Sequence, residues 1–174
     1  MYKDDFYMIP NTKLLGLTAF ITYFGMDALT TCLAVLISGA GAESNPLMVI
    51  TLGSYGLLGF IALKLLLSIG LIVPSYILSI LPGTRITGTS ALVAILTGGI
   101  LVTLNNATTL VMGVSIFYGL FHSIPYLNPV EIFGFIMLIT SVITFAIMSL
   151  SEGHVHYLKS QKALAKALLL LHQL

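Results

Sequence analysis

Four apolar stretches, each long enough to cross a lipid bilayer, make up most of this chain of 174 residues. A helix needs about 20 apolar residues to cross the roughly 30 Å of hydrocarbon in a bilayer. The four stretches cover residues 14–38, 47–81, 90–121 and 130–150. Because a backbone in lipid must satisfy its own hydrogen bonds, stretches of this length form helices. The sequence therefore predicts an all-α membrane protein with four transmembrane helices.

The composition agrees with a membrane-embedded chain. Hydrophobic residues make up 57% of the sequence and charged residues 7%, whereas a soluble domain carries about 25% charged residues. The net charge of +1 gives no general reason to expect nucleic acid as a partner. The single cysteine, Cys32, lies inside the first stretch, which excludes an intrachain disulfide and a CxxC site. We expect one transmembrane domain over residues 1–150 and no second globular domain.

A carboxylate lies close to the middle of the first stretch, in the sequence Asp27-Ala28-Leu29-Thr30-Thr31. An ionisable group near the bilayer centre is costly unless it is paired or neutral, so it marks a candidate functional site. Asp27 and Thr31 are four residues apart and therefore share one helix face with Tyr23. We expect this polar face to point into the helix bundle.

The second stretch is too long for one perpendicular span. Three glycines divide its first half, and we expect a short first segment to about Tyr55 before a span over residues 56–81. The alternative is a span that begins at Pro46. The two alternatives place the charged residue of this stretch at different depths in the membrane.

That charged residue, Lys64, is a candidate partner for Asp27. If the span begins near Gly56, Lys64 lies roughly 12 Å along it, and Asp27 lies about 16 Å from the end of its own stretch, at ~1.5 Å per residue. These depths match well enough for an ion pair. If the span begins at Pro46 instead, Lys64 lies near the opposite membrane face and extends its ammonium to the interface.

Two adjacent asparagines, Asn105 and Asn106, lie near the middle of the third stretch. Amide side chains form hydrogen bonds between helices within membranes. One interpretation makes either asparagine a partner of the Asp27–Lys64 pair, and the other makes both only points of helix–helix contact. The predicted intramembrane polar centre consists of Asp27, Thr31, Lys64, Asn105 and Asn106.

The sequence Glu43-Ser44-Asn45-Pro46 precedes the second stretch. Asparagine is a good N-cap and proline suits the first helical position, so the simplest interpretation is a helix start. The alternative makes Glu43 and Asn45 part of the outer mouth of a polar site. Asn128-Pro129-Val130-Glu131 is a second helix start of this kind, in which Glu131 completes a capping box.

Residues 151–174 have the pattern of a C-terminal amphipathic helix. Lys159, Lys162 and Lys166 fall on one face and leucines on another, which suits an anionic membrane surface or a groove on a partner protein. His154 and His156 are two residues apart and do not share a helix face. With no cysteine or acidic cluster to complete a ligand set, we predict neither a metal site nor a cofactor.

The basic residues predict the orientation of the chain. Four spans place both termini and the turn after the second span on one side of the membrane, and six basic residues then fall on that side: Lys3, Lys13, Arg85, Lys159, Lys162 and Lys166. By the positive-inside rule, both termini are cytoplasmic.

Several of these residues together resemble a family of small prokaryotic polytopic membrane proteins known only as a domain of unknown function (5658-like). The pattern is D-x-x-x-T, E-x-N-P-L, a lysine one helix later and an asparagine in the third span: Asp27, Thr31, Glu43, Asn45, Lys64 and Asn106. The resemblance covers residues 14–111 and brings no activity with it. It implies a prokaryotic cytoplasmic membrane and a joint role for Asp27, Glu43, Asn45 and Lys64.

Three functions from different classes are compatible with the sequence. The first is a structural or accessory subunit of a larger membrane complex, in contact with the lipid bilayer and with protein partners or further copies of the chain. The second is a small ion-coupled transporter that uses the polar centre and, with only four helices, requires an oligomer. The third is an intramembrane enzyme, which the sequence does not favour because no nucleophile–base pair, H-E-x-x-H or G-x-S-x-G motif is present.

Overall fold

The computed structural model describes residues 11–39, 43, 45–113 and 129–171, and every regular element within these ranges is a helix. The helices are α1 (Thr12–Phe20), the π-helical segment η1 (Ile21–Met26), α2 (Asp27–Ser38), α3 (Pro46–Ile80), α4 (Arg85–Met112) and α6 (Pro129–Leu171). In this part of the chain, four helical segments are long and apolar enough to cross a membrane: Thr12–Ser38, Pro46–Ile80, Arg85–Met112 and Gly134–His154. The predicted all-α fold with four such helices is confirmed.

The first span is one continuous helical rod that contains a π-helical turn. α1, η1 and α2 follow one another without a gap, and Asp27 is the first residue of α2. A π-helical turn adds a residue to the helical repeat and rotates the side chains that follow it. The direction in which Asp27 points therefore depends on this turn, which the apolar pattern of the sequence does not reveal.

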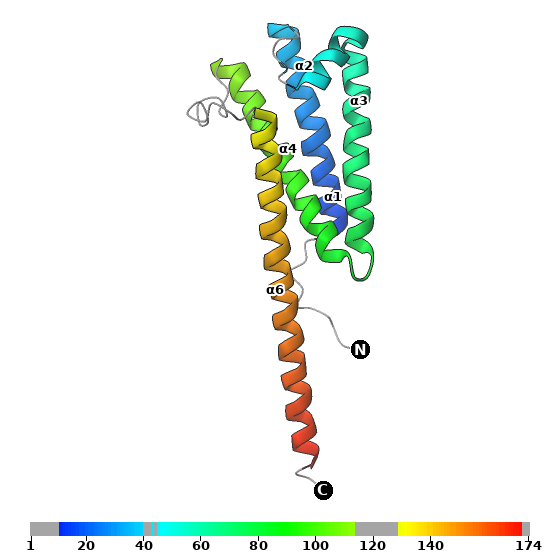
Figure 1. Cartoon of the computed structure of the whole chain (residues 1–174), viewed down its shortest axis with the longest axis vertical. Coiled ribbons are helices and arrows are strands. Elements are labelled where there is room, and N and C mark those ends of the chain that lie inside the picture. The colour runs from blue at the N-terminus through cyan, green and yellow to red at the C-terminus, as the bar shows by residue number, and fades with distance from the viewer. Residues whose placement is uncertain (1–10, 40–42, 44, 114–128, 172–174) are drawn as a thin grey trace.

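α3 is divided at Gly56, where φ is 64° and ψ is −164°. Backbone of this kind is accessible essentially only to glycine, because any Cβ would clash. The division separates a short first segment from the long part of α3, and the chain turns between them at one end of the bundle (Figure 1). The structure thus agrees with a short segment to Tyr55 and a span that starts at Gly56.

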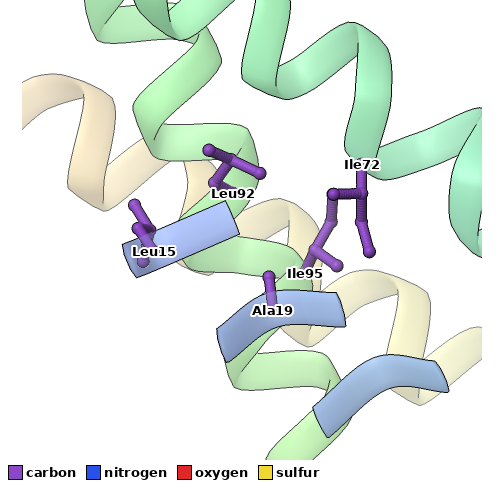
Figure 2. Close-up of a cluster of buried hydrophobic side chains, with 5 residues drawn as sticks. All are labelled: Leu15, Ala19, Ile72, Leu92 and Ile95. Atoms are coloured by element: carbon purple, nitrogen blue, oxygen red, sulfur yellow. The ribbon is translucent and has the colours of Figure 1, made fainter. Parts of the chain in front are cut away.

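α4 is the central helix and packs against α1, η1, α2, α3 and α6. A core of buried apolar side chains joins α1, α3 and α4 in the half of the bundle near the start of α1, as Figure 2 shows: Leu15, Ala19, Ile72, Leu92 and Ile95. Farther along α4, Gly99 brings the helix against η1, and a Cβ on Gly99 would lie 2.6 Å from the backbone nitrogen of Tyr23. The absence of a side chain at this position therefore sets how closely the two helices approach.

α6 is a single helix of 43 residues that packs on α4. At about 1.5 Å per residue it is roughly 65 Å long, about twice the hydrocarbon thickness of a bilayer. Its C-terminal part projects beyond the other helices (Figure 1). The expected helix over the tail is present up to Leu171. It continues the fourth span without a break, and the single glycine at this junction, Gly153, does not interrupt it.

The predicted end of the third span and the predicted start of the fourth lie at or beyond the edges of the described ranges. The sequence predicts a third span that reaches residue 121, but α4 ends at Met112, and Gly113 follows in the left-handed conformation typical of a helix C-terminus. The predicted cap Asn128 and the side chain of Glu131 lie outside the described residues.

Candidate functional site

Asp27 and Lys64 form an ion pair inside the bundle. Asp27 is at the start of α2 and Lys64 is in the long part of α3, and the Lys64 Nζ lies 2.6 Å from the Asp27 Oδ2. The two residues are only 6% and 8% exposed, respectively. Each charge therefore compensates the other in a place where either alone would be strongly destabilising.

The second carboxylate oxygen of Asp27 has partners on two helices. Its Oδ1 accepts hydrogen bonds from the Thr31 hydroxyl at 3.3 Å and from the Asn106 side-chain amide at 3.0 Å. With Lys64 on the other oxygen, the carboxylate joins α2, α3 and α4 at one point. Hydrogen bonds to a charged acceptor are among the stronger ones in proteins, so this point fixes the relative rotation of the three helices.

Asn106 is the asparagine that reaches the ion pair. Its Nδ2 also lies 3.0 Å from the Thr31 hydroxyl and 3.3 Å from the Thr30 hydroxyl, so two amide hydrogens are shared among three acceptors. The Thr30 hydroxyl donates to the Met26 carbonyl at 3.0 Å, which leaves its lone pairs to accept from Asn106. Asn105 is half-buried, and its backbone carbonyl accepts from hydroxyls one turn later in α4.

An aromatic ring lies against the Lys64 ammonium, and the short segment of α3 packs on that ring. The fully buried ring of Phe60 lies 5.1 Å from the Lys64 ammonium, a distance suited to a cation–π contact. Phe60 forms a buried apolar cluster with Met48 and Leu52 of the short segment, and half-buried side chains of α2 pack against this cluster. The turn at Gly56 thus places apolar side chains against the ring that contacts Lys64.

Glu43 and Asn45 lie at the start of α3 and act there as a helix cap. The Asn45 Oδ1 accepts from the Leu47 backbone amide at 3.1 Å, and the Glu43 Oε1 accepts from the Asn45 amide at 2.8 Å. Both residues are half-buried. Their hydrogen bonds satisfy amides at the start of the helix, and a role for them at an outer mouth stays a prediction.

The predicted basic surface lies on the C-terminal half of α6. Lys162 is exposed there, whereas the side chains of Lys159 and Lys166 are outside the described set. Among the residues that the structure describes, no group of three His, Cys, Asp or Glu side chains is placed to hold a metal ion.

Two features of the site are absent from the sequence prediction. The first is Phe60, which the sequence could have indicated because it precedes Lys64 by four residues and so shares its helix face. The second is the π-helical turn before Asp27, for which the residues Ile21–Met26 carry no recognisable signal.

Comparison with known proteins yields a family match only. The family described as a domain of unknown function (DUF5658) matches residues 18–112. This range contains the ion pair, Thr30, Thr31, Asn106 and the residues that cap α3. No curated protein and no solved structure matches the chain.

Proposed function

The chain belongs to the family known as domain of unknown function 5658, and from this premise we propose that it is an accessory subunit of a larger membrane complex. The observation that carries the proposal is the length of α6. The fourth apolar stretch ends at Leu150, yet α6 continues as one helix to Leu171, roughly 30 Å farther at 1.5 Å per residue. A rigid helix that extends this far beyond the span offers a surface to a partner protein.

The projecting part of α6 carries exposed apolar side chains next to basic ones. Tyr157 is 59% exposed and Leu158 is 45% exposed, and both lie beyond the apolar stretch that ends at Leu150. Exposed tyrosine and leucine are ordinary in a lipid-facing segment, but outside the membrane they favour contact with an amphipathic helix or groove. We therefore place the main partner contact on this part of α6.

The polar centre supports the same proposal. Its charges are paired at close range, both carboxylate oxygens have donors, and the buried Phe60 ring lies against the lysine ammonium. A close and buried ion pair holds helices in a fixed arrangement, as an assembly scaffold requires. In this proposal the centre fixes the bundle and α6 presents the partner surface.

Purification from native membranes in a mild detergent tests the partner surface. We expect the wild-type chain to retain a stoichiometric protein partner, and the double variant Tyr157→Ala/Leu158→Ala to lose on the order of 90% of it, because truncated anchor residues often cost 2 kcal/mol or more. Val142→Ala/Ile143→Ala is the matched control, since these side chains are exposed on the same helix inside its candidate span. A wild-type chain that purifies alone, or partner loss in the control alone, would contradict the proposal.

We place the chain in the cytoplasmic membrane of a prokaryote, with both termini in the cytoplasm. The start of α1, the turn before α4 and the C-terminal part of α6 lie toward the same end of the molecule (Figure 1). Lys13 and Arg85 are at that end, which supports the orientation by the positive-inside rule. Reporters fused after Leu174 should show cytoplasmic activity, and an external reading there would refute this topology.

An ion-coupled carrier is the second candidate. A π-helical turn directly precedes Asp27, and α3 breaks at Gly56 on the N-terminal side of Lys64. Irregular helices of this kind recur at transport sites. The double variant Asp27→Asn/Lys64→Met separates the two functions in reconstituted vesicles. A folded double variant that still binds its partner favours the subunit, whereas one that folds and loses an ion flux of the wild-type chain favours the carrier.

A further inference from the structure

A lateral groove runs between α1 and the long part of α3, away from the polar centre. It has a volume of about 320 Å³ and is lined by Lys13, Gly16, Leu17 and Phe20 from α1 and by Val73 and Tyr76 from α3. Apart from the lysine ammonium and the tyrosine hydroxyl, these side chains are apolar. Leu17 and Val73 are exposed, so the groove opens sideways, where lipid surrounds a transmembrane bundle.

Gly16 forms the floor of the groove. It is buried, and a Cβ at this position would lie 3.3 Å from the Tyr76 ring. A larger residue would displace this ring. The absence of a side chain at Gly16 therefore lets the Tyr76 ring lie against α1 in the groove.

The groove is confined to one leaflet and has a cation at its mouth. From Lys13 to Phe20 it extends seven residues along α1, about 10 Å at 1.5 Å per residue, which is less than half of the ~30 Å hydrocarbon thickness. Lys13 is exposed, one residue after the start of α1. A lysine at this depth places its ammonium among the lipid headgroups.

We propose that this groove binds one anionic phospholipid, with an acyl chain on Leu17 and Val73 and the headgroup phosphate at Lys13. The apolar walls match an acyl chain, and the single positive charge at the mouth complements a headgroup with net negative charge. A zwitterionic headgroup cancels most of that attraction. The proposal is independent of the accessory-subunit function and concerns a different face of the bundle from the partner contact on α6.

Native mass spectrometry of the full chain in detergent, titrated with phosphatidylglycerol or with phosphatidylcholine of the same acyl chains, tests the lipid site. We expect one tight phosphatidylglycerol per chain, bound about fivefold more strongly than phosphatidylcholine, the preference that one lysine near a headgroup provides. Lys13→Gln should remove the preference, and Val73→Trp, which fills the groove, should weaken the binding of both lipids. Both positions are exposed, so these variants should fold.

Lys162→Gln is the matched control, because Lys162 is also exposed but lies on the projecting part of α6. If Lys162→Gln removes the preference for phosphatidylglycerol as strongly as Lys13→Gln does, the preference comes from general charge attraction to the anionic lipid and not from a site, and the proposal fails. Retention of the preference in Lys13→Gln, or unchanged binding in Val73→Trp, overturns it as well. Full displacement of the lipid by soluble glycerol phosphate would show an anion site and overturn the acyl-chain contact.

Discussion

Asp27→Asn and Lys64→Met should each lower the free energy of unfolding by about 3–5 kcal/mol, and the double variant should lose clearly less than the sum. Each single change leaves a buried charge without its counter-ion, at a site where both residues are nearly inaccessible. The double change removes both charges together. The remaining loss reflects the hydrogen bonds that Thr31 and Asn106 make to the carboxylate.

Unfolding in mixed micelles, followed by circular dichroism over a series of denaturing detergent fractions, measures all three variants. The coupling energy of the cycle isolates the pair, provided that the double variant keeps the fold. Lys162→Met is the control for the lysine-to-methionine change, since Lys162 is exposed on α6. Strict additivity of the two single losses would mean that the ion pair contributes no stability.

Gly99→Ala should destabilise the bundle by about 1–3 kcal/mol, the usual cost of overpacking a close contact. The new Cβ would lie 2.6 Å from the Tyr23 nitrogen and 2.8 Å from the Thr22 carbonyl carbon. Both are backbone atoms of η1 and cannot move aside as a flexible side chain can. α4 must therefore separate from the segment that orients Asp27, which also weakens the contact of Asn106 with the carboxylate.

Gly70→Ala is the matched control for Gly99→Ala. Gly70 is an exposed helical glycine of α3, and a Cβ added there would meet no neighbouring side chain or helix within 4 Å. Alanine there should be neutral or slightly stabilising, because glycine in a helix interior costs up to about 1 kcal/mol relative to alanine. The same unfolding measurement applies to both variants. If both variants change the free energy of unfolding by the same amount, the close approach of α4 to η1 does not limit the residue at position 99.

Local properties of the sequence determined the number of helices and the depth of the polar residues. Apolar length alone predicts four membrane-crossing segments, because lipid offers the backbone no other partners. The glycines of the second stretch indicate a division that the structure places at Gly56. Counting residues from the ends of two spans then puts Asp27 and Lys64 at similar depths, since the helical rise is constant.

Only the tertiary structure decided how the helices are rotated and what surrounds the pair. Adjacent helical residues point about 100° apart, so the sequence alone leaves open which asparagine faces the carboxylate, and the packing of α4 on α2 brings the Asn106 amide to it. The π-helical turn before Asp27 and the place of the Phe60 ring over the Lys64 ammonium are likewise visible only in the structure. Periodicity along one helix specifies which residues share a face, but the face that meets a neighbour depends on how all the helices pack together.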